Sequence, residues 1–135
     1  MARTMGLDVG DSRIGVALSD PLGILASPLT IVTRSDIEAD TAAILALARR
    51  HDVESIVIGL PRNMDGSEGT QAGKVRDFTA ALSLRTDLPI VFQDERLSTV
   101  EAMRLFKEAG KTGRGTRYDA AAAALILQAH LDANS

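Results

Sequence analysis

The chain contains no cysteine and no tryptophan, and only 3% of its 135 residues are aromatic. Without cysteine there are no disulfide bonds and no thiolate metal sites. This is typical of a protein in a reducing cytoplasm, the compartment we expect. Because aromatic side chains are so few, stacking on bases is excluded as the main way of holding a nucleic acid.

Long apolar runs and an excess of positive charge are also missing. The longest unbroken apolar run covers residues 120–127, far short of a membrane span, and residues 1–5 lack the apolar core of a signal peptide. A net charge of −3 argues against a protein that coats nucleic acid broadly, but it is compatible with a nuclease that has an acidic centre. We expect one globular domain over residues 1–135 that does not associate with a membrane.

Residues 5–20 are the most informative segment, because apolar and small residues alternate along it. With a polar turn at Asp11-Ser12, the alternation predicts a β-hairpin that has one apolar face and one face of small residues. Asp8 falls on the small-residue face, where a carboxylate is costly unless a ligand such as a metal ion compensates its charge. The alternative is that Asp8 ends the strand and caps the turn. Val9 continues the alternation, which favours a site.

Strands and helices alternate along the rest of the chain, without a linker or a repeat. Further strands are predicted over residues 24–32, 54–59 and 88–93, the first at a sheet edge because of Pro28. Helices are predicted over residues 35–50, 70–84, 98–110 and 117–131, the first opened by a capping box from Ser35 to Glu38. Residues 60–69 are predicted to form a mobile loop. This order predicts an α/β fold in which a three-stranded antiparallel meander is extended by two parallel strands.

This topology predicts that several carboxylates lie at one edge of the sheet. Ligands of such sheets bind beyond the carboxyl ends of the parallel strands, which brings Asp8 together with Asp94 or Glu95. Either of the latter two can instead be a solvated turn residue. A third carboxylate, Asp119, stands three residues after Thr116, so that capping of the last helix is its competing interpretation.

The alanines of residues 120–124 favour a site at Asp119, because they let the last helix approach the small-residue face that carries Asp8. Three converging carboxylates, with no histidine or cysteine among them, are typical ligands of hard divalent cations. Open sites of this kind hold one or two Mg²⁺ or Mn²⁺ ions for phosphodiester cleavage. We interpret His51 and His130 as structural.

Five basic residues and one acidic residue, Glu108, lie between positions 104 and 117. Basic runs are usually solvated faces, but this one leads into Asp119 and is placed to hold a phosphate backbone. Tyr118 is the one candidate for stacking on a base, and core packing explains it equally well. The candidate substrate-binding residues are these five and one from the preceding loop region: Arg62, Arg104, Lys107, Lys111, Arg114 and Arg117.

Four motifs in order carry a resemblance to a known family. They are Gly6-Leu-Asp-Val-Gly10 with Arg13-Ile-Gly-Val-Ala17 and Ser19-Asp-Pro-Leu-Gly23, then Ile58-Gly-Leu-Pro61 with Gly66-Ser-Glu-Gly69, then Asp94-Glu-Arg-Leu-Ser-Thr99, and finally Asp119 before the alanines and Leu125-Ile-Leu-Gln128. Over almost its whole length the chain resembles the YqgF/RuvX family, Holliday-junction-resolvase-like members of the ribonuclease-H-like superfamily.

The resemblance implies a ribonuclease-H-like fold and metal-dependent nuclease chemistry. The implied substrate is the precursor of the small-subunit (16S) ribosomal RNA, and similarity to junction resolvases also suggests branched DNA. The acidic residues of the family correspond to Asp8, Glu95 and Asp119, which favours Glu95 over Asp94. Family members often have a small aliphatic residue where this chain has Tyr118, so the role of that side chain stays open.

Two alternatives come from other classes of protein. Actin-like and sugar-kinase-like nucleotide-binding modules have a similar phosphate-binding hairpin, but they hold nucleotide between two domains and 135 residues supply one. A non-catalytic ribosome- or transcription-associated factor on the same fold is expected to have lost a carboxylate, and all three are present. The sequence does not decide between RNA and branched DNA, nor between a monomer and a homodimer.

Overall fold

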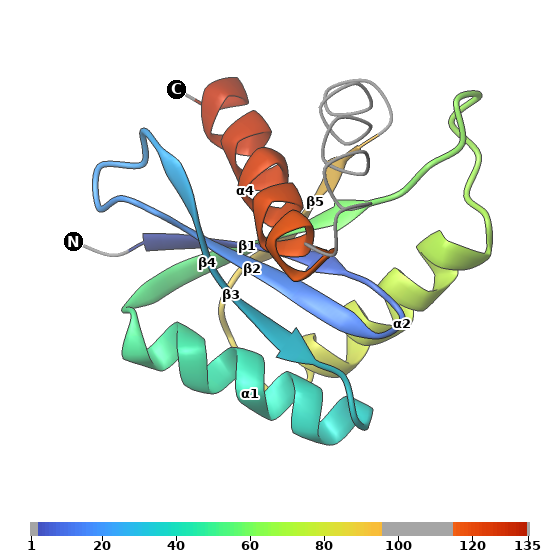
Figure 1. The fold of residues 1–135 in the computed structure, drawn as a ribbon, viewed down its shortest axis with the longest axis horizontal. Helices are drawn as coiled ribbons and strands as arrows, with labels where there is room; N and C mark the ends of the chain where they lie inside the picture. Colours follow the sequence, from blue (N-terminus) through green and yellow to red (C-terminus); the bar gives the residue numbers. More distant parts are fainter. Residues whose placement is uncertain (1–2, 96–114, 135) are drawn as a thin grey trace.

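The computed structural model describes residues 3–95 and 115–134, and the side chains of the second range from residue 119 onward. Five strands form one sheet in the order β3-β2-β1-β4-β5 (Figure 1). The strands β1 (Arg3–Val9), β2 (Arg13–Ser19) and β3 (Ala26–Thr33) are antiparallel neighbours, whereas β4 (Val53–Leu60) and β5 (Ile90–Asp94) run parallel to β1. The predicted mixed sheet, with its antiparallel meander and two parallel strands, is confirmed.

Helices cover both faces of this sheet. The helices α1 (Ile37–Arg50) and α2 (Thr70–Ser83) lie on one face, and α4 (Gly115–Ala133) lies on the other (Figure 1). The helix expected over residues 98–110 lies outside the described residues. Within the described ranges, no helix combines the length and the apolar character needed to cross a membrane.

The two faces of the first hairpin differ as the alternation predicts. The large apolar side chains of β1 and β2 are buried against α1 and α2, where Phe78 and Ile44 are fully covered. The small residues face α4. A Cβ added to Gly6 would lie 2.7 Å from the Cβ atom of Leu127 and 3.0 Å from the carbonyl oxygen of Ala123. Glycine in the strand and alanine in the helix therefore let α4 approach the sheet closely.

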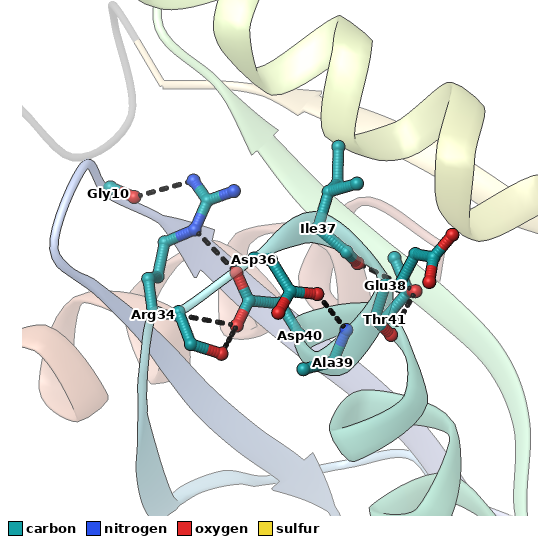
Figure 2. Close-up of polar contacts among 9 residues, drawn as sticks. Gly10, Arg34, Asp36, Ile37, Glu38, Ala39, Asp40 and Thr41 are labelled. Atoms are coloured by element: carbon teal, nitrogen blue, oxygen red, sulfur yellow. Dashed lines mark hydrogen bonds and ion pairs between the residues drawn. The ribbon is translucent and has the colours of Figure 1, made fainter.

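Helix starts differ in detail from the predictions. Asp36, not Ser35, caps α1, because its extended backbone lets the carboxylate accept the Ala39 N–H at 2.8 Å (Figure 2). The Ser35 N–H donates instead to Asp40. Since α4 begins at Gly115, Thr116 lies inside the helix and not at its cap.

Two loops are held by their own side chains. Strand β3 begins later than expected because the N–H groups of Ile24 and Leu25 donate to the Asp20 carboxylate, at 2.7 and 2.9 Å. In the loop after β4, which was predicted to be mobile, the Asp65 carboxylate accepts hydrogen bonds from the Ser67 N–H at 2.9 Å and from the Ser67 hydroxyl at 2.6 Å.

Candidate active site

The candidate site is built on a row of three residues that crosses the middle of the sheet. Asp8 on β1 is the register partner of Gly15 on β2. On the other side of β1, Leu7 pairs with Ile58, so Gly59 lies beside Asp8 on β4. We call Gly15, Asp8 and Gly59 the central row. Because both outer members are glycines, neither neighbouring strand places a side chain beside Asp8 in this row.

Glu95 fills the space on one side. A Cβ added to Gly59 would collide with the Glu95 carboxylate, and it would lie 2.5 Å from the Cδ1 atom of Ile126 on α4. Glu95 directly follows β5, and its N–H donates to the Leu60 carbonyl at 3.3 Å. The glycine in β4 therefore lets the carboxylate from the end of β5 lie over β4, toward Asp8.

The position of Glu95 raises the pKa of its carboxyl group. Burial raises it to about 7, and the negative charges of Asp8 and Asp94 contribute in the same direction. A carboxylate that is buried beside a second carboxylate gains most from a bound cation, which restores its ionised form. Perturbed carboxylates of this kind are concentrated at functional sites.

Helix α4 covers the other glycine of the central row. A Cβ added to Gly15 would collide with the main-chain oxygen of Asp119, so the helix backbone lies directly against β2 at this point. Asp119 is in the second helical turn, since α4 begins at Gly115, and this position does not suit an N-terminal cap. Its Oδ2 atom instead accepts a hydrogen bond from the Arg13 Nε at 2.5 Å.

The three predicted carboxylates are thus brought to one row, but not into one cluster. Across residues 3–95 and the described side chains of α4, no three histidine, cysteine, aspartate or glutamate side chains lie close enough to hold a metal ion. Asp8 and Glu95 interact electrostatically, whereas the Asp119 carboxylate is engaged by Arg13. The set of oxygen donors suits a hard divalent cation, provided that Asp119 leaves Arg13.

Asp94 has a different partner from Glu95. Its Oδ2 atom lies 3.8 Å from Arg62, which is also 3.8 Å from Glu68. Arg76 donates two hydrogen bonds to Glu68, and they lower the pKa of that carboxyl. Of the predicted substrate-binding residues, the structure therefore places Arg62 at the end of β5. The other five lie outside the described side chains: Arg104, Lys107, Lys111, Arg114 and Arg117.

The turn after Asp8 is anchored from the opposite face of the sheet. Arg34 donates one hydrogen bond to the Gly10 carbonyl at 3.0 Å and another to the Asp40 carboxylate at 3.1 Å (Figure 2). Asp40 is 2% exposed, and the Arg34 guanidinium lies 5.3 Å from the centre of the Phe78 ring. We call Arg34 and Asp40 the clamp. It fixes the main chain two residues beyond Asp8.

The model of the RuvX family, described as Holliday junction resolvase, matches residues 2–133. The chain belongs to this family. A relative from Moorella thermoacetica is 52% identical over 132 residues, which covers 96% of this chain and 94% of the relative. A second, from Dehalococcoides mccartyi, is 50% identical over 124 residues, or 92% and 93% of the two chains. Both carry the name "Putative pre-16S rRNA nuclease".

Solved structures resemble this RuvX chain over nearly its whole length. Thermus thermophilus RuvC in complex with a Holliday junction substrate matches with a TM-score of 0.62 and 15% identity, over 99% of this chain and 96% of RuvC. The fowlpox virus Holliday junction resolvase matches with a TM-score of 0.56 and 7% identity, over 98% of this chain and 99% of the resolvase. At such identities the likeness shows the fold, and the expected ribonuclease-H-like architecture is confirmed. Family membership identifies the chain as a nuclease.

Two parts of this RuvX site were missing from the predictions made on sequence. Gly59 makes room for the Glu95 carboxylate, and Arg13 engages Asp119. Both residues belong to the motifs that carry the family resemblance, Arg13 at the start of β2 and Gly59 near the end of β4. Gly59 is itself a member of the central row, and Arg13 precedes Gly15 of that row by two positions. Their membership of these motifs was the sequence feature that could have identified them.

Proposed function

We propose that this RuvX protein cleaves phosphodiester bonds in the precursor of 16S ribosomal RNA, with Asp8, Glu95 and Asp119 as ligands of one or two Mg²⁺ or Mn²⁺ ions. The observation that carries the proposal is the central row. Asp8 stands between two glycines, one covered by the Glu95 carboxylate and the other by the helix that bears Asp119. Two relatives that are about half identical carry a name with this RNA as the substrate. The proposal places the protein in the cytoplasm.

The chemistry divides between the cation and the chain. A bound divalent cation would polarise the scissile phosphate and supply a hydroxide nucleophile at neutral pH. Asp8 and Glu95 would hold it, because a positive charge offsets both their mutual repulsion and the cost of burying the ionised Glu95. Ile126 of α4, which approaches Gly59, would limit access of water from the helix side.

Replacement of each carboxylate by its amide tests the catalytic part. In Asp8→Asn, Glu95→Gln and Asp119→Asn, loss of a ligand should lower the cleavage rate on the order of 100-fold. The triple variant should be scarcely slower than the single ones, because the ligands act as a unit. The matched control is Asp11→Asn, since Asp11 lies at the same edge but pairs with Lys74 on the exposed surface. Full activity of all three amide variants would show that these carboxylates do not catalyse cleavage, whereas absence of metal-dependent cleavage by the wild type would identify a non-catalytic factor.

Branched DNA is the second candidate substrate. It is supported by the description of the family and by the fold shared with resolvases. Cutting a junction requires two active sites, and hence a homodimer, whereas trimming or cutting one strand requires only a monomer. Cleavage of a pre-16S RNA end, a four-way DNA junction and plain single strands should be compared at one salt and metal concentration, together with the molar mass in solution. Under our proposal the RNA end is cleaved fastest.

The basic segment is proposed to bind the phosphate backbone. Exchanging Lys111 and Arg114 for alanine should weaken nucleic-acid binding and flatten its log–log salt dependence by roughly 0.7 to 0.9 for each phosphate that is no longer neutralised. The rate at saturating substrate should change little. Arg117 is the exception we propose, because it precedes Asp119 by two positions in the sequence and a contact with the scissile phosphate would change the rate. An unchanged salt slope would indicate that the nucleic acid binds at another surface, the loop that begins at Arg62.

A further inference from the structure

The pair formed by Arg13 and Asp119 differs from the arginine–carboxylate pair of the clamp. In the clamp, the side chains of Arg34 and Asp40 are 20% and 2% exposed, and each has further hydrogen bonds. The Arg13 side chain is 42% exposed, and that of Asp119 is 17% exposed. Separating an exposed arginine from its carboxylate costs little free energy, because water solvates both groups. Separating a buried pair leaves an uncompensated charge in the interior and costs much more. Of the two pairs, separation therefore costs less for Arg13 and Asp119 than for the clamp.

The backbone determines which partner moves. The main-chain oxygen of Asp119 lies against Gly15, so this residue is held at the central row by the docking of α4. Arg13 is the first residue of β2 and reaches Asp119 through a long side chain from the exposed end of the strand. If the pair separated, the Asp119 carboxylate would stay beside the row and the guanidinium would turn toward solvent.

We propose that Arg13 takes the place of the cation at Asp119 when no divalent cation is bound, and releases this carboxylate when one enters. The freed guanidinium then binds a phosphate of the nucleic acid, for which its planar, forked donors are well suited. The inference rests on the proposed function. It also accounts for the separation of Asp119 from the pair of carboxylates formed by Asp8 and Glu95.

Mn²⁺ binding to the full chain, followed by calorimetry without nucleic acid, tests the exchange. In Arg13→Gln the competing positive charge is gone, so the affinity for Mn²⁺ should rise about two- to fivefold, the range that corresponds to an exposed ion pair. The matched control is Arg76→Gln, because Arg76 is 46% exposed and binds Glu68 through its Nε at 2.6 Å, but Glu68 is not a proposed ligand. Its affinity for Mn²⁺ should equal that of the wild type.

A double-mutant cycle assigns the effect to this pair. In an Asp119→Asn background, Arg13→Gln should leave the affinity for Mn²⁺ unchanged. At saturating Mn²⁺, Arg13→Gln should still cleave at least about tenfold more slowly, because the phosphate is deprived of a charged donor. The exchange predicts tighter Mn²⁺ binding together with slower cleavage. A purely structural role of Arg13 would instead lower both the affinity for Mn²⁺ and the cleavage rate.

The outcomes distinguish this inference from the proposed function. If the wild type binds Mn²⁺ and Asp8→Asn abolishes the binding, but Arg13→Gln binds Mn²⁺ as well as or more weakly than the wild type, the exchange is wrong and the metal site stands. Unchanged cleavage at saturating Mn²⁺ would refute the contact with phosphate. If the wild type binds no Mn²⁺, the proposed function fails and the exchange fails with it.

Discussion

Replacing Glu95 by glutamine should stabilise the metal-free protein at pH 8 and leave its stability nearly unchanged at pH 4. The pKa of Glu95 is raised to about 7 by burial and by the charges of Asp8 and Asp94, against an ordinary value of 4.5. Between these two values the folded protein binds more protons than the unfolded chain. Its stability therefore falls as the pH rises from 4.5 through 7.

The size of the effect follows from the difference between the two pKa values. A pKa of about 7 against 4.5 corresponds to roughly 3 kcal/mol of unfolding free energy that is lost by pH 8. Glutamine resembles the protonated carboxyl and carries no charge at any pH. For a domain of this size, the urea midpoint of Glu95→Gln at pH 8 should exceed that of the wild type by about 1 to 3 M.

Urea unfolding in the presence of a chelator, followed by far-UV circular dichroism at pH 4 and pH 8, measures this difference. Glu68→Gln is the control of opposite sign, because Arg76 lowers the pKa of that exposed carboxyl. The ion pair of Glu68 stabilises the folded protein above the ordinary pKa of this carboxyl, and this stabilisation is lost as the pH falls. Glu68→Gln should therefore not stabilise the protein at pH 8. Equal midpoints of Glu95→Gln and the wild type at pH 8 would show that Glu95 does not lie buried beside Asp8.

Three further outcomes are expected. Asp8→Asn should raise the melting temperature of the metal-free protein by relieving repulsion, and it should reduce the increase on adding Mg²⁺; a lower melting temperature without metal would make Asp8 a structural hydrogen-bonding residue. Asp40→Ala should lower the urea-measured stability by about 2 to 3 kcal/mol, because Arg34 loses its charged partner; an unchanged stability would contradict the clamp. Gly15→Ala should cost about 1 to 3 kcal/mol, since the new methyl group must displace the α4 backbone; a neutral result would mean that α4 docks elsewhere.

Most of the fold follows from local pattern. The alternation around Asp8 specifies both faces of the first hairpin, and the alanines of α4 indicate which face that helix covers. The cap of α1 shows where local pattern stops being sufficient. Ser35 and Asp36 are both good capping residues, and the choice between them depends on the backbone path that leads from β3, which also brings the Ser35 N–H to Asp40.

The site was predicted less completely, because its contacts join distant parts of the chain. Spacing alone left Asp94 and Glu95 equivalent, and the family resemblance favoured Glu95. The structure separates them physically: Glu95 lies over Gly59, whereas Asp94 lies near Arg62. The pairing of Arg13 with Asp119 spans 106 positions and leaves no periodic signal in either segment. Whether Asp8, Glu95 and Asp119 perform the chemistry stays a prediction.

The close docking of α4 links the proposed site to the local stability of this helix. One of the three proposed ligands belongs to this helix, whereas Asp8 lies on β1 and Glu95 directly follows β5, so local undocking of α4 would separate Asp119 from the other two. The helix approaches the sheet closely at Gly6 and Gly15, and its Ile126 and Leu127 side chains are fully buried in the core between them. A cation shared between Asp8 and Asp119 would tie the helix to β1. Amide hydrogens of α4 should then exchange with solvent more slowly when the metal is bound, and those buried in the core formed with α1 and α2 should exchange as before.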